Sequence, residues 1–450
     1  MIKILLIGCC LSMVFAGPGF SQSKLELTSP DGTLKLRPHG YGYFRIGQIV
    51  RGIGVISETP VVEGVYTEEA YGGLSMEFDY KEHLTLHMGV DVKMYFSYPQ
   101  EINFFVTKYA REDVLLGPTY ANFSYQKTRL GDFNFSLGYF GFKYNPDAKN
   151  LGEFMFRSAT YPAYIITYMD YPEAKLLGLH FCHELFDHHL KQDLLFTTET
   201  TFYPTQDWSL SYLLSGSIGK FLELGAGVSL SHLLSVYNDE FDPGMGSLTD
   251  PKVDGDNGNQ YIDKNGDTLY YTFRGNKVMA RLSVDPKVFI PGAKSLFGES
   301  DLKLYVEALV IGTKSYPDTR LGGGEQYSYD NWLEKMPVTF GFNLPAFKIL
   351  DVFNVEFEWW DSKYINNYYN VYMTTSLPNP DKLNPKVTRS PWKWSVLAKK
   401  SFYDGHFGII AQAARDHMRL PSANYQHSPT QEMLIEAGDW WWSFKTSFSF

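Results

Sequence analysis

The sequence of 450 residues is poor in cysteine and in basic residues, and it has no long apolar run after its first residues. Of its three cysteines, Cys9 and Cys10 lie in an apolar N-terminal segment, so Cys182 is left alone and an internal disulfide is excluded from the mature chain. Forty Lys and Arg against fifty Asp and Glu give a net charge of -10, which disfavours a nucleic-acid partner. The lack of an uninterrupted apolar run of about 18 residues argues against a helical membrane protein.

The first 21 residues have the pattern of a secretory signal. Lys3 supplies a positive charge, an apolar stretch runs from Ile4 to about Ala16, and small residues follow, with cleavage after Ser21 or after Ala16. Cys9 matches a lipoprotein cleavage box, but the eight residues before it are too few for a working apolar region. We therefore expect residues 1–21 to be a signal peptide and residues 22–450 to form a single exported domain.

The rest of the chain alternates between apolar and polar residues. Every second residue is apolar from Leu84 to Met94, and the same period recurs at 222–230 and 353–359. Because successive strand side chains point to opposite faces, each segment predicts a ribbon with one apolar and one polar face. At 208–217 serines occupy the polar face, with Leu213 as the exception, whereas the other face carries large groups. Such a division is expected where the large face meets lipid.

We predict sixteen strands, which begin near residues 41, 70, 83, 119, 132, 173, 190, 207, 221, 268, 301, 335, 352, 390, 406 and 437. Short turns and long loops alternate between them, as an up-and-down barrel with both termini on one side requires. Two connections break the alternation: 204–206 is short where a long loop is due, and 286–300 is long where a turn is due. Either the strand count is wrong by a pair, or one periplasmic loop is enlarged.

The last strand carries aromatic residues on one face up to the C-terminus. These residues are Trp440, Trp442, Phe444, Phe448 and the terminal Phe450. A strand that ends in this way resembles the signal by which Gram-negative outer-membrane β-barrels are recognised and inserted. Two other segments, 138–147 and 301–307, are similar to pieces of porin-like proteins. The fold class we expect is all-β: a transmembrane up-and-down antiparallel β-barrel of about 16 strands.

This resemblance implies a location in the bacterial outer membrane, with outer-membrane lipid and the barrel-assembly machinery as partners. Sixteen strands leave a water-filled lumen, so we expect a porin-like channel for passive diffusion of small hydrophilic solutes. The polar face gives these candidate pore-lining residues: Glu77, Asp79, Asp91, Lys93, Glu223, Lys303, Glu307, Glu356, Glu358 and Lys445. Acids outnumber bases in this set, which predicts a mild cation preference. Individual members can equally be ordinary solvated residues.

The third long loop, from Asn145 to about Tyr171, is the candidate constriction of the pore. In general porins the third long loop folds inward, and by this analogy the charged residues Asp147, Lys149, Glu153 and Arg157 would narrow the lumen. Mixed charges beside aromatic residues would also suit a loop that caps the outer rim.

The loop at 250–267 contains candidate calcium ligands. Asp263, Asn265 and Asp267 have the spacing that opens a calcium-binding loop, and Asp254 and Asp256 offer a second start. The pattern then fails, because Thr268 and Arg274 stand where glycine and glutamate belong. An exposed acidic loop without an ion explains the same composition. No other cofactor is expected.

Two further groups of residues could carry chemistry. Around the turn at 185–189, His180, Cys182 and Glu184 share one strand face, so a transition-metal site is geometrically possible, although polar turn residues explain them as well. Asp416 and His417 could form half of a catalytic dyad, but adjacent strand residues point to opposite faces. We therefore do not expect an enzyme.

Two alternatives to a pore stay open. A transporter of hydrophobic compounds would have a narrow lumen closed by a short N-terminal segment. A structural or adhesive barrel would act through its extracellular loops.

Overall fold

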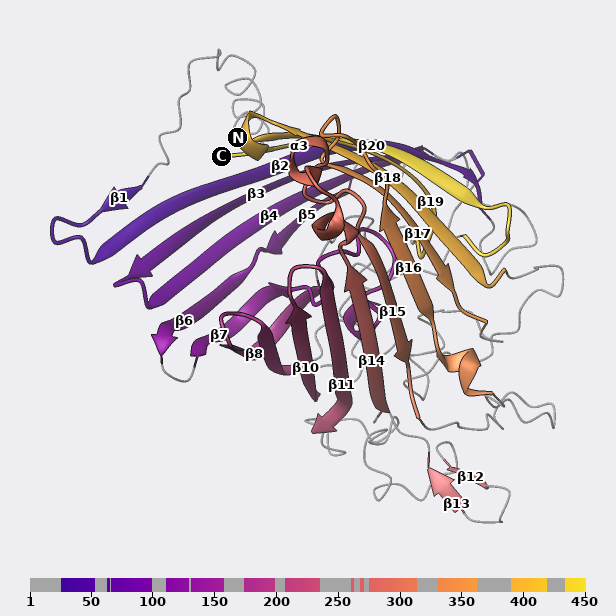
Figure 1. Ribbon diagram of the computed structural model, residues 1–450, viewed down its shortest axis with the longest axis horizontal. Coiled ribbons are helices and arrows are strands. Elements are labelled where there is room, and N and C mark those ends of the chain that lie inside the picture. The colour runs from indigo at the N-terminus through magenta and orange to yellow at the C-terminus, as the bar shows by residue number, and fades with distance from the viewer. Residues whose placement is uncertain are drawn as a thin grey trace.

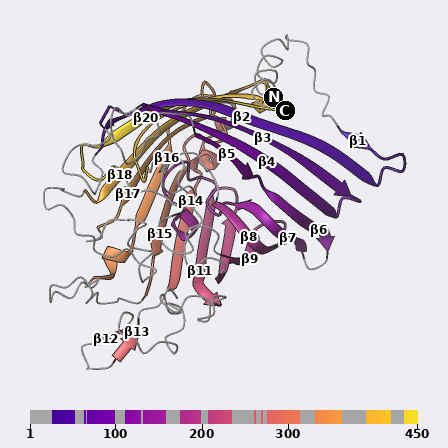
Figure 2. The same ribbon diagram turned by 180° about the vertical axis from the view of Figure 1, so that it is seen from behind.

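The computed structural model describes residues 26–52, 63–64, 66–98, 111–128, 131–157, 174–198, 207–234, 260–262, 268–270, 275–313, 331–361, 390–418 and 434–450. Most of these residues belong to one antiparallel sheet that closes on itself (Figure 1). Figure 2 shows the same ring of strands from behind. In the described part of the chain, no helix is both long enough and apolar enough to cross a membrane.

The barrel has sixteen strand positions, which we call staves and which follow the order of the sequence. They are β2 (Leu34–Arg51), β3 (Tyr66–Tyr80), β4 (Leu84–Tyr98), β5 (Arg111–Leu116) with β6 (Thr119–Thr128), β7 (Gly131–Phe142), β8 (Ala174–Leu185), β9 (Leu190–Thr198), β10 (Trp208–Ile218), β11 (Leu222–Leu234), β14 (Gly275–Val284), β15 (Leu304–Val310), β16 (Val338–Asn343), β17 (Val352–Trp359), β18 (Trp392–Phe402), β19 (Phe407–Arg415) and β20 (Trp440–Ser449). The ring closes where β20 pairs with β2, with Tyr41 opposite Ser449. β1 (Leu27–Thr28) only folds back on the start of β2.

β5 and β6 share one position in the ring because the stave breaks between them. Val90 of β4 pairs with Leu116 of β5, and Leu84 of β4 pairs with Phe123 of β6. Gly117 and Pro118 separate the two pieces. Proline has no N–H to donate to a sheet ladder, so a break at this position is expected.

The predicted strand number and fold class are confirmed, but several bounds differ: β2 and β5 begin at Leu34 and Arg111, ahead of the starts predicted near 41 and 119. The segment near residue 268 is β13 (Thr268–Tyr270), which pairs only with β12 (Gln260–Ile262), and the stave itself begins at Gly275. The long connection at 286–300 lies at the end of the barrel that carries the tight turns, which we call the turn end. It is one enlarged loop that contains η1 (Pro286–Phe289) and α3 (Ala293–Leu296). Of the two explanations for the broken alternation, the enlarged periplasmic loop is therefore the correct one.

The tight turns contain residues in backbone conformations that reverse the direction of the chain. Lys81 and Glu82 both have positive φ angles, of 53° and 60°, between β3 and β4. Two successive residues with positive φ match the right-handed twist of the strands that they join. Phe347 and Lys348 repeat this conformation between β16 and β17.

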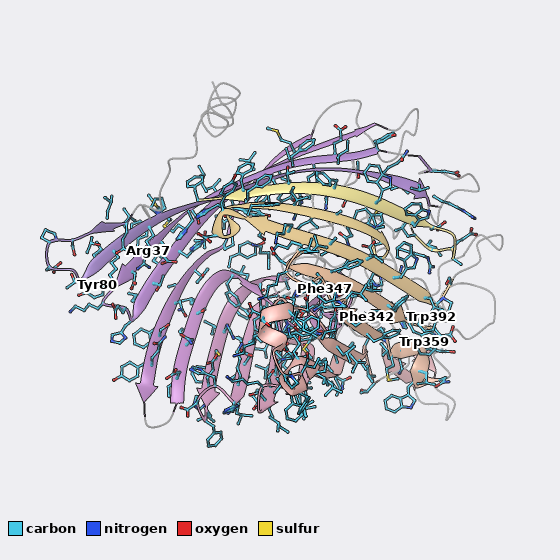
Figure 3. All side chains as sticks on the ribbon, turned by 45° about the horizontal axis from the view of Figure 1, so that its top comes forward. Arg37, Tyr80, Phe342, Phe347, Trp359 and Trp392 are labelled. Carbon is cyan, nitrogen blue, oxygen red and sulfur yellow. The ribbon has the colours of Figure 1, made fainter. Side chains whose placement is uncertain are left out.

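The two faces of the barrel divide as a membrane requires. Leu74 and Val90 are 64% and 53% exposed on the outside, whereas Glu69 and Glu356 are 2% and 0% exposed on the inside. Trp359 pairs with Trp392 at the long-loop edge, and Tyr80 lies at the turn end (Figure 3). Aromatic residues at both edges of an apolar band mark the two membrane interfaces. The chain is therefore an outer-membrane-type β-barrel of porin-like architecture.

Part of the interior differs from the prediction of a uniformly polar inner wall. Residues 143–157, which we call the inner segment, leave β7 and turn into the barrel, and they end in the short helix α2 (Phe154–Arg157). Phe154, Met155 and Phe156 pack in a buried cluster with apolar residues of the inner wall. Those wall residues are Phe140, Phe142, Ala174, Leu176, Leu195, Leu213, Met279 and Leu309. Leu213, the exception to the serine pattern, lies on the inner face like the serines. Its apolar side chain packs in the cluster with the inner segment.

Candidate functional site

All ten candidate pore-lining residues lie on the inner face of the barrel, and most of them have charged or polar partners there. The Nζ of Lys93 lies 2.6 Å from a Glu69 oxygen. The guanidinium of Arg37 is 2.7 Å from Glu77 and 3.7 Å from Asp79. Glu223 accepts a hydrogen bond from Arg281. The Nζ of Lys445 lies over the Tyr43 ring, 4.6 Å from its centre.

Sequence reasoning missed most of the basic partners of the inner wall. Arg45, Lys277, Arg281 and Lys393 are all buried on the inner face. Each alternates along its strand with outward residues, so the period of two could have identified them. Inner-wall acids such as Glu69 and Asp193 are also outside the predicted set, so its ratio of acids to bases does not give the charge of the wall.

The inner segment is attached across the lumen through the carboxylate of Glu356 on β17. One Glu356 oxygen accepts the backbone N–H of Lys149 at 2.5 Å, and the other accepts those of Asn150 at 2.8 Å and Leu151 at 2.7 Å. The segment begins at β7, the fifth stave, and β17 is the thirteenth, so 13 - 5 = 8 staves separate them in a ring of sixteen. The segment therefore joins opposite sides of the barrel.

A second buried carboxylate, Glu307 on β15, holds both ends of the inner segment. It accepts hydrogen bonds from the Tyr144 hydroxyl, from the Nδ2 of Asn145 at 2.9 Å, and from the backbone N–H of Phe154 at 3.1 Å. Within the segment, Glu153 accepts the backbone N–H of Asn145 at 2.6 Å. Hydrogen bonds to ionised groups are among the stronger ones in proteins, about 1.5–3 kcal/mol each. The segment is therefore fixed rather than loosely laid in the lumen.

Asp147 attaches the first half of the inner segment to the wall. Its carboxylate accepts a hydrogen bond of 2.5 Å from Ser283 and lies 3.4 Å from the Nζ of Lys303. Burial raises the pKa of Asp147, but the bond from Ser283 and the charges of Lys303 and Lys149 outweigh it, so the pKa is lower than usual. Burial also lowers the pKa of Lys149, although Asp147 and Glu356 oppose this shift.

Asp416 and His417 contribute to the same region but have different partners. Asp416 accepts hydrogen bonds from the Nδ2 of Asn150 at 2.7 Å and from the Nε1 of Trp441 at 2.9 Å. The Nε2 of His417 instead lies 2.8 Å from Glu358. The candidate dyad is thus divided between two sets of contacts, and Asp416 holds the inner segment.

The segment and the wall together place three of the four candidate constriction residues inside the barrel: Asp147, Lys149 and Glu153. Arg157 ends α2, and its side chain lies outside the described residues, as do residues 1–21. Asp254, Asp256, Asp263, Asn265 and Asp267 also lie outside the described residues, so calcium binding stays a prediction.

The aromatic C-terminal residues Trp440, Trp442, Phe444, Phe448 and Phe450 lie on the last stave and at its end. Phe450 exchanges two backbone hydrogen bonds with Gly40, of 3.0 and 3.1 Å. A Cβ added at Gly40 would come within 2.2 Å of the Phe450 ring, and one at Gly42 within 2.6 Å of Phe448. Glycine at these two positions therefore makes room for the terminal aromatic rings.

Comparison with known proteins gives similarity at the level of structure only. No protein-family model and no curated protein matches the sequence. OmpF of Salmonella typhi, in a complex with daunomycin, is similar with a TM-score of 0.47 and 12% identity over 95% of this chain and 100% of that chain. The outer-membrane channel DcaP of Acinetobacter baumannii gives 0.45 and 9% over 94% and 99%. A mutant of the Rh. blastica porin gives 0.41 and 8% over 92% and 100%.

Proposed function

We propose that this protein is an outer-membrane channel through which small hydrophilic solutes diffuse passively. The observation that carries the proposal is the inner segment, which spans a barrel whose inner wall is largely polar outside the apolar cluster, and which is anchored by Glu307 and Glu356. A segment in this position reduces the cross-section that is open to a solute. Solutes would be selected by size at this level and by the charges that face the remaining space.

A mild cation preference is part of the proposal. The inner wall carries acids and bases in close pairs, such as Lys93 with Glu69 and Arg37 with Glu77. Paired charges cancel much of each other's field in the lumen, so the preference should be weak. A ring of one sign would be needed for strong selectivity.

The test is conductance of the purified protein in planar lipid bilayers. We expect stepwise increases of current and a reversal potential in a salt gradient that shows a small preference for cations. Bilayers that stay silent, with lipid or fatty acid co-purified with the protein, would contradict a hydrophilic channel and support a transporter of hydrophobic compounds. A clear anion preference would contradict the proposed cation preference but not the proposed channel.

A further inference from the structure

A group of three potential metal ligands lies on the inner wall, on the neighbouring strands β8 and β9. The ligand atoms of His180, Cys182 and Asp193 all lie within 4.8 Å of one another. The Nε2 of His180 is 2.8 Å from an Asp193 oxygen. His180 and Cys182 share a face by their spacing in the sequence, whereas Asp193 joins them only through strand pairing.

The register of the two strands brings these three side chains together. His180 and Cys182 are two residues apart on β8, so they point to the same face. Cys182 pairs directly with Asp193 across the ladder. Cys182 and Asp193 are buried, and the His180 ring packs against Phe140 and Phe142, with ring centres 5.7 and 5.2 Å away. The ligand atoms are thus held in place by backbone pairing and by ring packing.

We propose that His180, Cys182 and Asp193 bind a divalent transition-metal ion of the zinc class. Thiolate, imidazole and carboxylate are the three side-chain donors that Zn²⁺ uses, at about 2.0–2.3 Å. Tetrahedral ligands at such lengths lie roughly 3.3–3.7 Å apart, so the observed group needs only small movements. His180 is partly exposed, and a water molecule from the lumen would complete the fourth position.

Binding requires the Cys182 thiol to lose its proton, and it changes the charge next to Lys191. The S–H bond of Cys182 breaks, an S–Zn bond forms, and the proton leaves to water, so binding strengthens as the pH rises. Lys191 lies 3.3 Å from the second oxygen of Asp193 and can keep this contact while the first oxygen, which faces His180, binds the metal. Glu184 pairs with Lys191 in the ladder, and its carboxylate contacts His188 and accepts from the Cys182 thiol at 3.9 Å. The metal brings two positive charges and the thiol proton removes one, so the local charge rises by one when the metal enters.

A metal ion at this position would join β8 to β9 on the lumen side. This proposal does not depend on conduction through the barrel. A silent bilayer would leave it intact, and a failure to bind metal would leave the channel proposal intact.

The experiment titrates the full-length purified protein in detergent with Co²⁺, which takes tetrahedral zinc sites and gives a thiolate-to-cobalt charge-transfer band. We expect one equivalent to bind with this band and to be displaced by Zn²⁺. Cys182→Ser should abolish the band. His180→Gln and Asp193→Asn should each weaken binding by about tenfold or more.

His183→Gln is the matched control, because His183 lies one residue away and stacks on Phe133 with ring centres 4.3 Å apart. It should bind Co²⁺ as the unmodified protein does. Heat-modifiable migration on gels should show that every variant is a folded barrel. The proposal is overturned if the unmodified protein shows no charge-transfer band, if the band survives in Cys182→Ser, or if His183→Gln removes it.

Discussion

The carboxylate of Glu356 accepts the backbone N–H of Asn150 at 2.8 Å, although 206 positions separate the two residues in the sequence. The contact joins the inner segment to the wall opposite its origin. Lys149 and Leu151 donate to the same carboxylate. The position of the middle of the segment therefore depends strongly on one acidic side chain.

Replacement of Glu356 should release the middle of the inner segment. In Glu356→Gln the carboxamide keeps a single acceptor oxygen and places an NH₂ group among backbone donors, at a cost of roughly 1.5–3 kcal/mol for each charged hydrogen bond that is lost. We expect larger and noisier conductance steps in planar bilayers. Glu223→Gln is the control: it also removes an inner-wall carboxylate, but one that pairs with Arg281 of the wall, so it should change the lumen charge without the larger and noisier steps. Unchanged conductance in Glu356→Gln alongside a folded barrel would contradict the role of the segment.

Gly227 tests the apolar attachment of the same segment. A Cβ at this position would lie 3.0 Å from Met155, 3.2 Å from Leu213 and 3.3 Å from Met279. Gly227→Leu should therefore displace α2 at a cost of about 1–3 kcal/mol from overpacking, again with altered conductance. Gly72→Leu is the matched control, because an added Cβ at Gly72 meets nothing within 4 Å. Equal behaviour of the two variants would argue against packing of α2 at this wall.

Acid should weaken the attachment of the inner segment at Asp147. The folded-state pKa of Asp147 is lower than its usual value, so its ionised form stabilises the folded state above about pH 4, and this contribution is lost as the pH falls through the folded-state pKa. We expect bilayer currents to become less uniform below about pH 4. Asp147→Asn should reduce this dependence on pH. An unchanged acid response in that variant would assign the effect to other carboxylates.

Removal of Phe450 should impair closure and insertion of the barrel. The deletion eliminates both backbone hydrogen bonds with Gly40 and the outward ring beside it. We expect less protein in the outer-membrane fraction and more in the periplasm, measured by cell fractionation. Phe402→Ala, which removes another exposed aromatic residue at the turn end, serves as the control. Normal insertion without Phe450 would refute the interpretation of the C-terminus as an insertion signal.

The sequence by itself determined the strands, their faces and the ring. Alternation is a local property, because each side chain's direction follows from its neighbours on the same strand. For this reason Leu84 and Met94 on the outside, and Glu356 and Glu358 on the inside, could be assigned without a structure. Closure of the ring followed from the outward apolar face, since a sheet in lipid cannot leave an unpaired edge.

Only the tertiary structure decided what fills the ring. The hydrogen bonds of Glu307 and Glu356 with the inner segment, and the meeting of Cys182 with Asp193, join residues on different strands. Such contacts depend on the register between strands and on the path of a loop across the lumen. Neither can be read from the alternation of apolar and polar residues. A polar residue on the inner face gives the same pattern whether it meets water or a buried backbone N–H.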